Sequence, residues 1–474
     1  LSSPLPEPAP GRDTQVTVTV FRRGRIDTAQ SRPLALPARG DTAWVSFDLS
    51  MPAGTDRLEL VVVVYHDDAL QVAVLDGPIV AADADLPGDT AWTLRLGTTG
   101  EFGGGSVPGL VVDDAGIAQL DLAVGVAASA PVATGKAAMR RRILDALEAE
   151  SSRPKLKHLA PVLADLAIDG RLLRDQLLGA GPSPLDEAPR IRVASVEAGD
   201  PLPLEVVYDH AAPRDNTVPL CPPAAKGADR CAGDCAHKDD AGVVCPFGFW
   251  GVSTSIERVR PAHPGAPPPS GDQRLAISGG ALVGISDKAS GRTASAGKRI
   301  VKAFRSLTGR SRTLAAWTWE EWDQAVAGAP PLLALVTHSD STGGRPALEI
   351  GDGRLRPIQQ FTVGTVNPGG LTPGPMVVLL GCETAHLETS YTDLVDRMHA
   401  VGGAVVLAVQ TPVRGAQVAE LVSVLVDALK DQIAGAGPHP VGEVLRATRS
   451  ELLRSGRIVG LALVSTGDGG IQLS

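Results

Sequence analysis

The stretch PGPMVVLLGCETAHLETS (373–390) is the clearest indication of the fold. Residues 376–380 form an uninterrupted apolar run, which is typical of a strand buried on both faces of a sheet. Gly381 and Cys382 follow at once. In open α/β sheets, the carboxyl ends of the strands carry the reactive side chains. Cys382, which stands apart from the other four cysteines, therefore lies where a catalytic group is expected.

Apolar runs and amphipathic helical patterns alternate on both sides of this stretch. Such an alternation predicts a mainly parallel sheet covered by helices. The expected strands are 190–198, 202–209, 281–290, 332–337, 376–381, 404–410 and 459–467, and the expected helices are 295–307, 391–402, 416–435 and 440–456. Residues 311–329 predict a short strand followed by a helix. Between 341 and 375 the sequence predicts a long loop.

His338 ends the apolar strand 332–337 in the way that Cys382 ends its own strand. The carboxyl ends of parallel strands share one edge, about 5 Å apart per strand, so the two side chains are expected to face each other. A neighbouring imidazole and the start of the following helix would both activate the thiol. Taken alone, either residue could be structural, since a buried cysteine often acts as a small hydrophobe. Their joint position favours a Cys–His dyad.

The chain before residue 190 has two other patterns. Residues 14–98 alternate apolar and polar side chains between turn residues, which predicts an antiparallel β-sandwich. Residues 134–180 have a helical period, with Gly170 and Gly179 as expected helix ends. We therefore expect a multidomain chain with a β-sandwich interaction domain at 1–130, a short helical segment at 131–185 and an α/β domain at 186–474.

Four cysteines gather at 221–250, within the α/β domain, at the spacing C-x9-C-x3-C-x9-C. This insertion is rich in Gly, Pro, Ala and Asp, and four thiolates hold Zn²⁺ tetrahedrally with no position left for a catalytic water. The sequence predicts a structural zinc site made by Cys221, Cys231, Cys235 and Cys245. Three cysteines with His237, disulfides and free cysteines remain as alternatives.

The composition of the 474 residues argues against several classes of protein. The net charge is −9, and no block of Lys and Arg is long enough for a nucleic-acid interface. No apolar run reaches the length of a membrane span, and the start has no signal-peptide pattern. We therefore expect a cytoplasmic protein without nucleic-acid or membrane partners, in which thiols stay reduced. No strand precedes a phosphate-binding loop, which disfavours a nucleotide enzyme.

Residues 379–429 resemble the core of CHAT domains, the caspase-HetF-associated branch of the caspase-like cysteine peptidases. The matching motifs are Gly381-Cys382-Glu383-Thr384-Ala385, Gly402-Gly403-Ala404-Val405-Val406 and Pro412-Val413, and LLALVTHSD (332–340) matches the strand that bears the histidine. The resemblance covers about 190–474. It implies a C-terminal caspase-like α/β/α domain that cleaves peptide bonds, with Cys382 as nucleophile and His338 as acid/base. The segment at 245–251 is similar to one in bacterial CHAT-like proteins.

The resemblance also implies an oxyanion hole and a specificity pocket. The expected oxyanion donors are the N–H groups of Ser339 and Cys382. Family members usually have Gly directly after the histidine, where this chain has Ser339. An acidic residue in the pocket would favour Arg or Lys in the substrate, and the candidates are Asp209, Asp287 and Asp340. Each of them could equally be an ordinary surface or capping carboxylate.

The sequence thus predicts a cysteine endopeptidase that acts on a protein or peptide substrate and is controlled by a regulatory partner bound to the β-sandwich. One alternative is a catalytically inactive caspase-like scaffold. Another is a sensor, in which the zinc loop and the sandwich bind a partner and the α/β domain only carries them.

Overall fold

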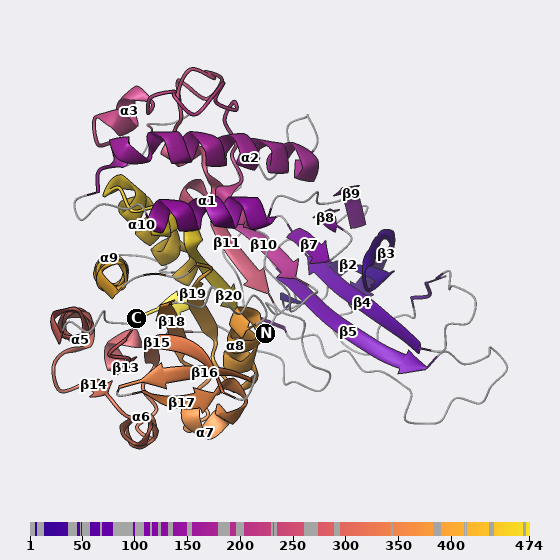
Figure 1. Ribbon diagram of the computed structural model, residues 1–474. Coiled ribbons are helices and arrows are strands. Elements are labelled where there is room, and N and C mark those ends of the chain that lie inside the picture. Colours follow the sequence, from indigo (N-terminus) through magenta and orange to yellow (C-terminus); the bar gives the residue numbers. More distant parts are fainter. Residues whose placement is uncertain are drawn as a thin grey trace. The chain divides into compact units, whose positions relative to one another are not determined.

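In the computed structural model the chain divides into two compact units, each built from separate stretches of sequence. Figure 1 shows the ribbon coloured along the sequence. The first unit comprises Leu1–Ala133, Asp175–Glu197 and Glu257–Asp272, and the second comprises Thr134–Arg174, Ala198–Ile256 and Gln273–Ser474. The structure describes residues 5–6, 14–36, 45–47, 49, 57–66, 69–78, 98–99, 109–113, 116–121, 125–130, 136–148, 154–178, 190–195, 203–228, 231, 235–259, 274–288, 294–342, 345–351, 353–382, 390–411, 413, 415–435, 440–467 and 471–474.

An antiparallel sheet of four strands, in the order β3-β2-β4-β5, dominates the first unit. Its strands are β2 (Thr14–Arg22), β3 (Arg25–Leu36), β4 (Arg57–His66) and β5 (Ala69–Pro78). Alternate residues of β2, Val16, Val18 and Val20, form a hydrophobic cluster with Val64 of β4. This period of two is the pattern read from the sequence, and the predicted N-terminal antiparallel sheet is confirmed.

The first unit also contains a strand from far along the chain. The meander β7 (Gly109–Asp113), β8 (Gly116–Asp121) and β9 (Gly125–Ala130) is antiparallel. β10 (Arg190–Ser195) pairs in parallel with β7, and two short strands, β1 (Leu5–Pro6) and β6 (Thr98–Thr99), pair with each other. The buried Arg192 of β10 donates to Glu257 of β11 (Ser255–Val259) at 3.1 Å. The first unit thus extends well beyond the stretch of 1–130.

The second unit is built on mixed α/β architecture, as the alternation of patterns predicts. Its strands lie in the order β14-β13-β15-β18-β19-β20, and they are parallel except that β20 runs antiparallel to β19. They are β13 (Ala281–Ile285), β14 (Thr313–Ala316), β15 (Leu332–Thr342), β18 (Met376–Cys382), β19 (Val405–Val409) and β20 (Leu463–Gly467). A separate short pair joins β12 (Arg274–Leu275) to β21 (Gln472–Leu473).

Helices cover both faces of these strands (Figure 1). The longer helices of the described chain are α1 (Lys136–Glu148), α2 (Ala160–Leu178), α5 (Ala294–Thr308), α6 (Trp319–Val326), α8 (Ser390–Ala400), α9 (Gly415–Ala434) and α10 (Val441–Arg454), and the short ones are α3 (Pro222–Ala225), α4 (Trp250–Ser253) and α7 (Val363–Val366). α6, α7 and α8 bury their apolar side chains against Leu333, Leu335, Val377 and Leu379 of the sheet. α5, α9 and α10, which pack on one another, lie on the opposite side.

The predictions for Gly170 and for one strand are wrong. Gly170 does not end its helix, because α2 continues through it to Leu178. A Cβ on Gly170 would lie 1.9 Å from the carbonyl oxygen of Val206, so glycine permits a close approach between two segments. The expected strand at 202–209 is a 3-10 turn, Leu204–Val206, because the prolines beside it remove donors that a strand needs. Gly179 lies outside the described residues.

The predicted loop after His338 is instead a β-hairpin followed by a short helix. β15 runs on to Thr342, β16 (Arg345–Ile350) turns back antiparallel to it, and β17 (Arg354–Pro357) pairs with β16. α7 then precedes β18. β13 pairs with β15 only as far as Val336, and β16 pairs with the same edge of β15 from His338 onward. This arrangement places residues of β16 beside His338.

Candidate functional site

The backbones of His338 and Cys382 lie side by side on two neighbouring strands, at the point where the parallel pairing of β15 with β18 ends. β15 pairs with β18 in a register that opposes Thr337 to Gly381 and His338 to Cys382. His338 is partly exposed, and Cys382 is the last residue of β18. The helix expected after the cysteine is α8, which begins at Ser390. The remaining motif residues, 383–385, lie outside the described part of the chain.

A buried carboxylate lies on the other side of His338. In the antiparallel pair of β15 and β16, the register partner of His338 is Glu349, which is 1% exposed. Its Oε1 accepts a hydrogen bond of 3.0 Å from the Ser286 hydroxyl, and its Oε2 accepts one of 2.6 Å from the Lys288 ammonium. Ser286 and Lys288 follow β13, so three strand ends contribute to this edge of the sheet.

The sequence pattern does not indicate Glu349 as a functional residue, because the segment that contains it predicts a loop. One signal was present. Glu349 stands between Leu348 and Ile350, which are both buried in the core. An acidic residue between two apolar ones in a short alternating segment indicates a strand. The apolar side chains lie on one face of the strand, and the carboxylate lies on the other face, where it needs a polar partner if it is buried.

Gly351 fixes the hairpin to the end of β13. Its N–H donates to the carbonyl of Ile285 at 2.7 Å, and its own carbonyl accepts from the Asp287 N–H at 3.3 Å. Its φ of +65° is in the left-handed region, and an added Cβ would lie 1.6 Å from the carbonyl oxygen of Trp317. Only glycine satisfies both conditions, so this residue sets the path of the chain into β16.

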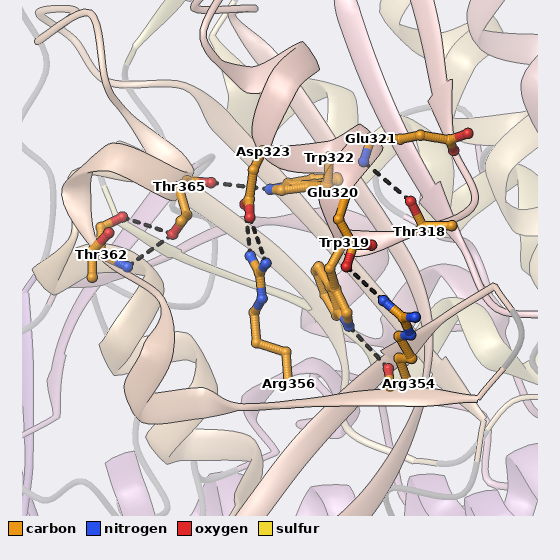
Figure 2. A network of polar contacts seen from close by, with 10 residues as sticks. All are labelled: Thr318, Trp319, Glu320, Glu321, Trp322, Asp323, Arg354, Arg356, Thr362 and Thr365. Carbon is orange, nitrogen blue, oxygen red and sulfur yellow. Dashed lines mark hydrogen bonds and ion pairs between the residues drawn. The ribbon is translucent and has the colours of Figure 1, made fainter.

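Two ion pairs attach the hairpin to α6 (Figure 2). Arg356 of β17 binds Asp323 through two hydrogen bonds, of 2.8 and 2.7 Å, and Arg354 binds Glu320 at 2.6 Å. The Arg356 guanidinium also lies 4.4 Å from the centre of the Trp319 ring. Stacked, bidentate arginine pairs of this kind fix geometry more firmly than isolated surface ion pairs.

Two indole groups complete the network around α6 (Figure 2). Trp319 Nε1 donates to the Arg354 carbonyl at 2.9 Å, and Trp322 Nε1 donates to the Thr365 carbonyl at 3.1 Å. The Thr318 hydroxyl caps the helix by accepting from the Glu321 N–H at 3.1 Å. The strand pair β16–β17, which contains Glu349, is therefore attached to α6, a helix whose N-terminus is capped by Thr318.

The expected substrate-binding and oxyanion residues have different surroundings. Ser339 and Asp340 continue β15 and are opposite Leu348 and Ala347 of β16. Asp287 is exposed after β13. Asp209 is largely buried, and its Oδ1 accepts a hydrogen bond of 2.6 Å from Trp250 and lies 3.6 Å from Arg174 Nε. These contacts give Asp209 a structural role in the segment that carries the cysteines.

The four clustered cysteines converge on one point. Their sulfur atoms all lie within 4.8 Å of one another, and none of the four is in a disulfide. Cys245 Sγ is 3.6 Å from Cys231 Sγ and 3.9 Å from Cys235 Sγ. Four thiolates around a tetrahedral ion, at about 2.3 Å from it, would have sulfur–sulfur edges of roughly 3.8 Å. The cluster therefore could hold a metal ion. His237 pairs with Asp240 at 3.5 Å.

The thiols differ in their affinity for protons. A hydrogen bond from the Cys245 thiol lowers the pKa of Cys221 to about 6, and the same bond raises the pKa of Cys245. Burial raises the pKa of Cys231 to about 12. The cluster thus favours one thiolate even without an ion. A bound cation would favour the others, because metals bind thiolates rather than thiols.

A buried arginine ties the cysteine-rich segment to the core of the second unit. Arg449 of α10 binds Glu205 at 3.1 Å, and both side chains are fully buried. Its Nε donates to the Leu463 carbonyl at 2.8 Å and its Nη1 to the Gly251 carbonyl at 3.5 Å. Gly251 belongs to α4, which follows Cys245, the last cysteine of the cluster. The segment directly after the cluster is therefore bound to the core of the second unit through Arg449.

Among the helices that the structure describes, none has the length and apolar character needed to cross a membrane.

Comparisons with solved structures give a weak structural likeness. No protein-family model matches the chain, and no curated protein matches it. Among solved structures, the chain is similar to the arginine-specific cysteine proteinase gingipain R, with 11% sequence identity and a TM-score of 0.33. The likeness covers 71% of this chain and 76% of that one.

Proposed function

We propose that the protein is a cysteine endopeptidase of the caspase-like type, with Cys382 as nucleophile and His338 as acid/base. The observation that carries the proposal is the register of β15 and β18, which opposes His338 to Cys382. Register partners on neighbouring strands are about 5 Å apart, a separation that side chains of this size can span. The parallel pairing of the two strands ends here, and β18 itself ends at Cys382, so a substrate can reach the pair from the sheet edge.

In this mechanism the proton of the Cys382 thiol passes to His338, and the thiolate attacks the peptide carbonyl carbon. The N–H groups of Ser339 and Cys382 are the proposed donors to the oxyanion. His338 then protonates the leaving amine as the C–N bond breaks, which leaves a thioester. Water hydrolyses the thioester with His338 as base, and the thiol is restored.

We also propose that the substrate is a protein or peptide with Arg or Lys before the cleaved bond. Asp340, two residues after His338 on β15, and the exposed Asp287 after β13 are the better acidic candidates for that contact. Asp209 is the weaker candidate, because its carboxylate already binds Trp250 and Arg174.

The test is the rate at which iodoacetamide labels Cys382 from pH 5 to 9, read peptide by peptide by mass spectrometry. In the wild type we expect fast labelling well below pH 8. In His338→Ala the rate at pH 6 should fall about tenfold or more, because a free thiol is mostly protonated there. His158→Ala, at an exposed histidine, is the matched control and should label like the wild type. A peptide library then identifies the cleaved bond.

Slow labelling of Cys382 that does not depend on His338 would contradict the peptidase. The alternative would then be an inactive caspase-like scaffold or sensor that acts through protein contacts. Whether or not the protein is a peptidase, we propose that the N-terminal unit is a β-sandwich interaction module. Its sequence contains no group of residues that suggests catalysis. We propose a regulatory protein as its partner.

We propose further that the cysteine cluster holds a structural Zn²⁺. The sulfur separations of 3.6 and 3.9 Å support a tetrahedral ion, and four thiolates would leave it no open position. Elemental analysis of the purified protein should find about one zinc ion per chain. Cys235→Ser should lose the ion, whereas the control Cys382→Ser should keep it. Equal metal content in both variants would contradict the assignment.

A further inference from the structure

We propose that Glu349 is a positioning residue for His338, so that Cys382, His338 and Glu349 act as a row of nucleophile, base and orienting acid across three strands. This inference rests on the proposed function. His338 has a register partner on each side, Cys382 on β18 and Glu349 on β16. Cysteine and serine hydrolases commonly have this order of groups, in which a third group orients the base.

The sheet itself places His338 and Glu349 on one face. Leu333 and Leu335 of β15 and Leu348 and Ile350 of β16 belong to the hydrophobic core beneath α6 and α8. Side chains alternate along a strand, so the even-numbered His338 and the odd-numbered Glu349 belong to the opposite face. Directly opposed residues of an antiparallel pair have Cβ atoms about 4.5–5.5 Å apart. Side chains of this length can meet across that distance, and the contact that we propose joins the His338 ring to the Glu349 carboxylate.

The Glu349 carboxylate is held in place and still has room for another donor. It is 1% exposed and accepts one hydrogen bond on each oxygen, from Ser286 and from Lys288. A carboxylate has about four lone-pair sites, so an imidazole N–H can join these two donors. Lys288 offsets the charge of the buried carboxylate, which would otherwise be costly to desolvate.

The chemical effect follows from the tautomer of the ring. When one imidazole nitrogen donates to Glu349, the other is an acceptor that faces the thiol. As the proton moves from sulfur to this nitrogen, the imidazolium that forms has the Glu349 carboxylate as its neighbour. The same proton later passes to the leaving amine. Glu349 thereby stabilises the thiolate–imidazolium pair without itself exchanging a proton.

The direct test is the pKa of the His338 imidazole, measured by NMR titration of the full chain in a Cys382→Ala background, with His338→Gln to assign the signal. Glu349→Gln should lower this pKa by about one unit or more, because an anionic neighbour is lost. Lys288→Met should raise it, because a cation is lost while Glu349 remains. Asp323→Asn, which disturbs the same hairpin through Arg356, should leave it unchanged. The other titratable groups at this edge are Asp287 and Asp340, and every variant of the series keeps both; the Cys382→Ala background removes the thiol from all of them.

Shifts of opposite sign in Glu349→Gln and Lys288→Met would establish the contact whether or not the protein is a peptidase. With Cys382 present, Glu349→Gln should then slow the iodoacetamide labelling of Cys382 at acid pH. Its dependence of labelling rate on pH should become more like that of His338→Ala. A His338 pKa that ignores both substitutions would overturn the positioning role. A pKa that responds while Cys382 labels slowly in every variant would leave the contact standing and contradict the peptidase.

Discussion

His210 is a histidine that folding holds in its neutral form. It is 8% exposed, and its Nδ1 has no hydrogen-bond partner among the described residues. Burial, with a smaller contribution from the Lys238 ammonium, lowers the pKa of His210 to about 4. An unfolded chain would bind a proton at this histidine with a pKa of about 6.5. Acid therefore favours unfolding as the pH falls below about 6.5, and the effect is complete near pH 4.

We expect this histidine to make the wild type sensitive to mild acid. Between pH 7 and pH 5, protonation of the unfolded chain at His210 should cost about 2 kcal/mol of stability at most. In His210→Phe, which keeps an aromatic ring beside Tyr208, that loss should be absent. The measurement is the urea midpoint of both proteins at the two pH values. Equal losses in both would show that His210 is not the group that titrates.

The ion pair of Arg449 and Glu205 should be much more sensitive to a single substitution than to a paired one. Arg449→Met removes the cation that neutralises the buried Glu205 carboxylate, at a cost of about 3–5 kcal/mol. The double variant Arg449→Met, Glu205→Gln removes both charges and should recover a good part of that loss. Urea unfolding of the two variants gives the comparison. No recovery in the double variant would indicate that the carbonyls of Leu463 and Gly251 matter more than the charge.

At the residue scale, the positions of His338 and Cys382 could be predicted because each ends an apolar run, which is a local pattern. The four cysteines could also be grouped, because few other arrangements suit their composition and spacing. Glu349 could not be identified in this way. Its significance depends on which residue of β15 it opposes, and register is set by pairing between segments rather than by either segment alone.

Gly351 offers a test of the hairpin as an element. Gly351→Ala places a Cβ against the Trp317 carbonyl and requires a left-handed residue, which together should cost about 3 kcal/mol. Gly353→Ala is the matched control. Gly353 also has a positive φ, of +109°, but an added Cβ there meets nothing within 4 Å, so about 1–2 kcal/mol is expected.

Both glycine variants are to be compared by thermal unfolding and by the iodoacetamide labelling rate of Cys382. We expect Gly351→Ala to change the labelling rate as well, because it shifts the start of β16. Similar effects of the two substitutions would mean that the close contact with Trp317 is easily relaxed.

At the element scale, the alternating strands and helices of the second unit could be predicted because their apolar periods are long and regular. The hairpin β16–β17 was missed because its strands are short, contain prolines and are separated by Gly351 and Gly353, all of which suggest a loop. Gly170 was misread for a related reason. A glycine that ends a helix and a glycine that permits a close contact within a helix cannot be distinguished from a single sequence.

At the scale of the whole molecule, we expect that the fragment 1–133 does not reproduce the first unit. Without β10, the backbone of β7 lacks the parallel partner that pairs with residues 109–112. Hydrogen exchange of the β7 amides should be faster in the fragment than in the full chain, while amides of β2 and β4 keep their protection. Equal protection of β7 in both would show that β10 contributes little to it.

The composition and the order of patterns could predict a chain of more than one unit, because the period changes near residues 134 and 190. Membership of the units could not be predicted in the same way. β10 and part of β11 belong with the first unit although the sequence around them continues into the second. Such pairing depends on contacts between distant segments, which no local pattern records.

The pairing of β10 with β7 also has a consequence for how the protein is made. A ribosome releases β7 about 80 residues before β10, and the helices α1 and α2, most of which belong to the second unit, emerge in between. During that interval β7 offers an open strand edge, the kind of surface on which nascent chains aggregate. The chain is therefore expected to depend on a chaperone, or on slow elongation, until residue 195 is free.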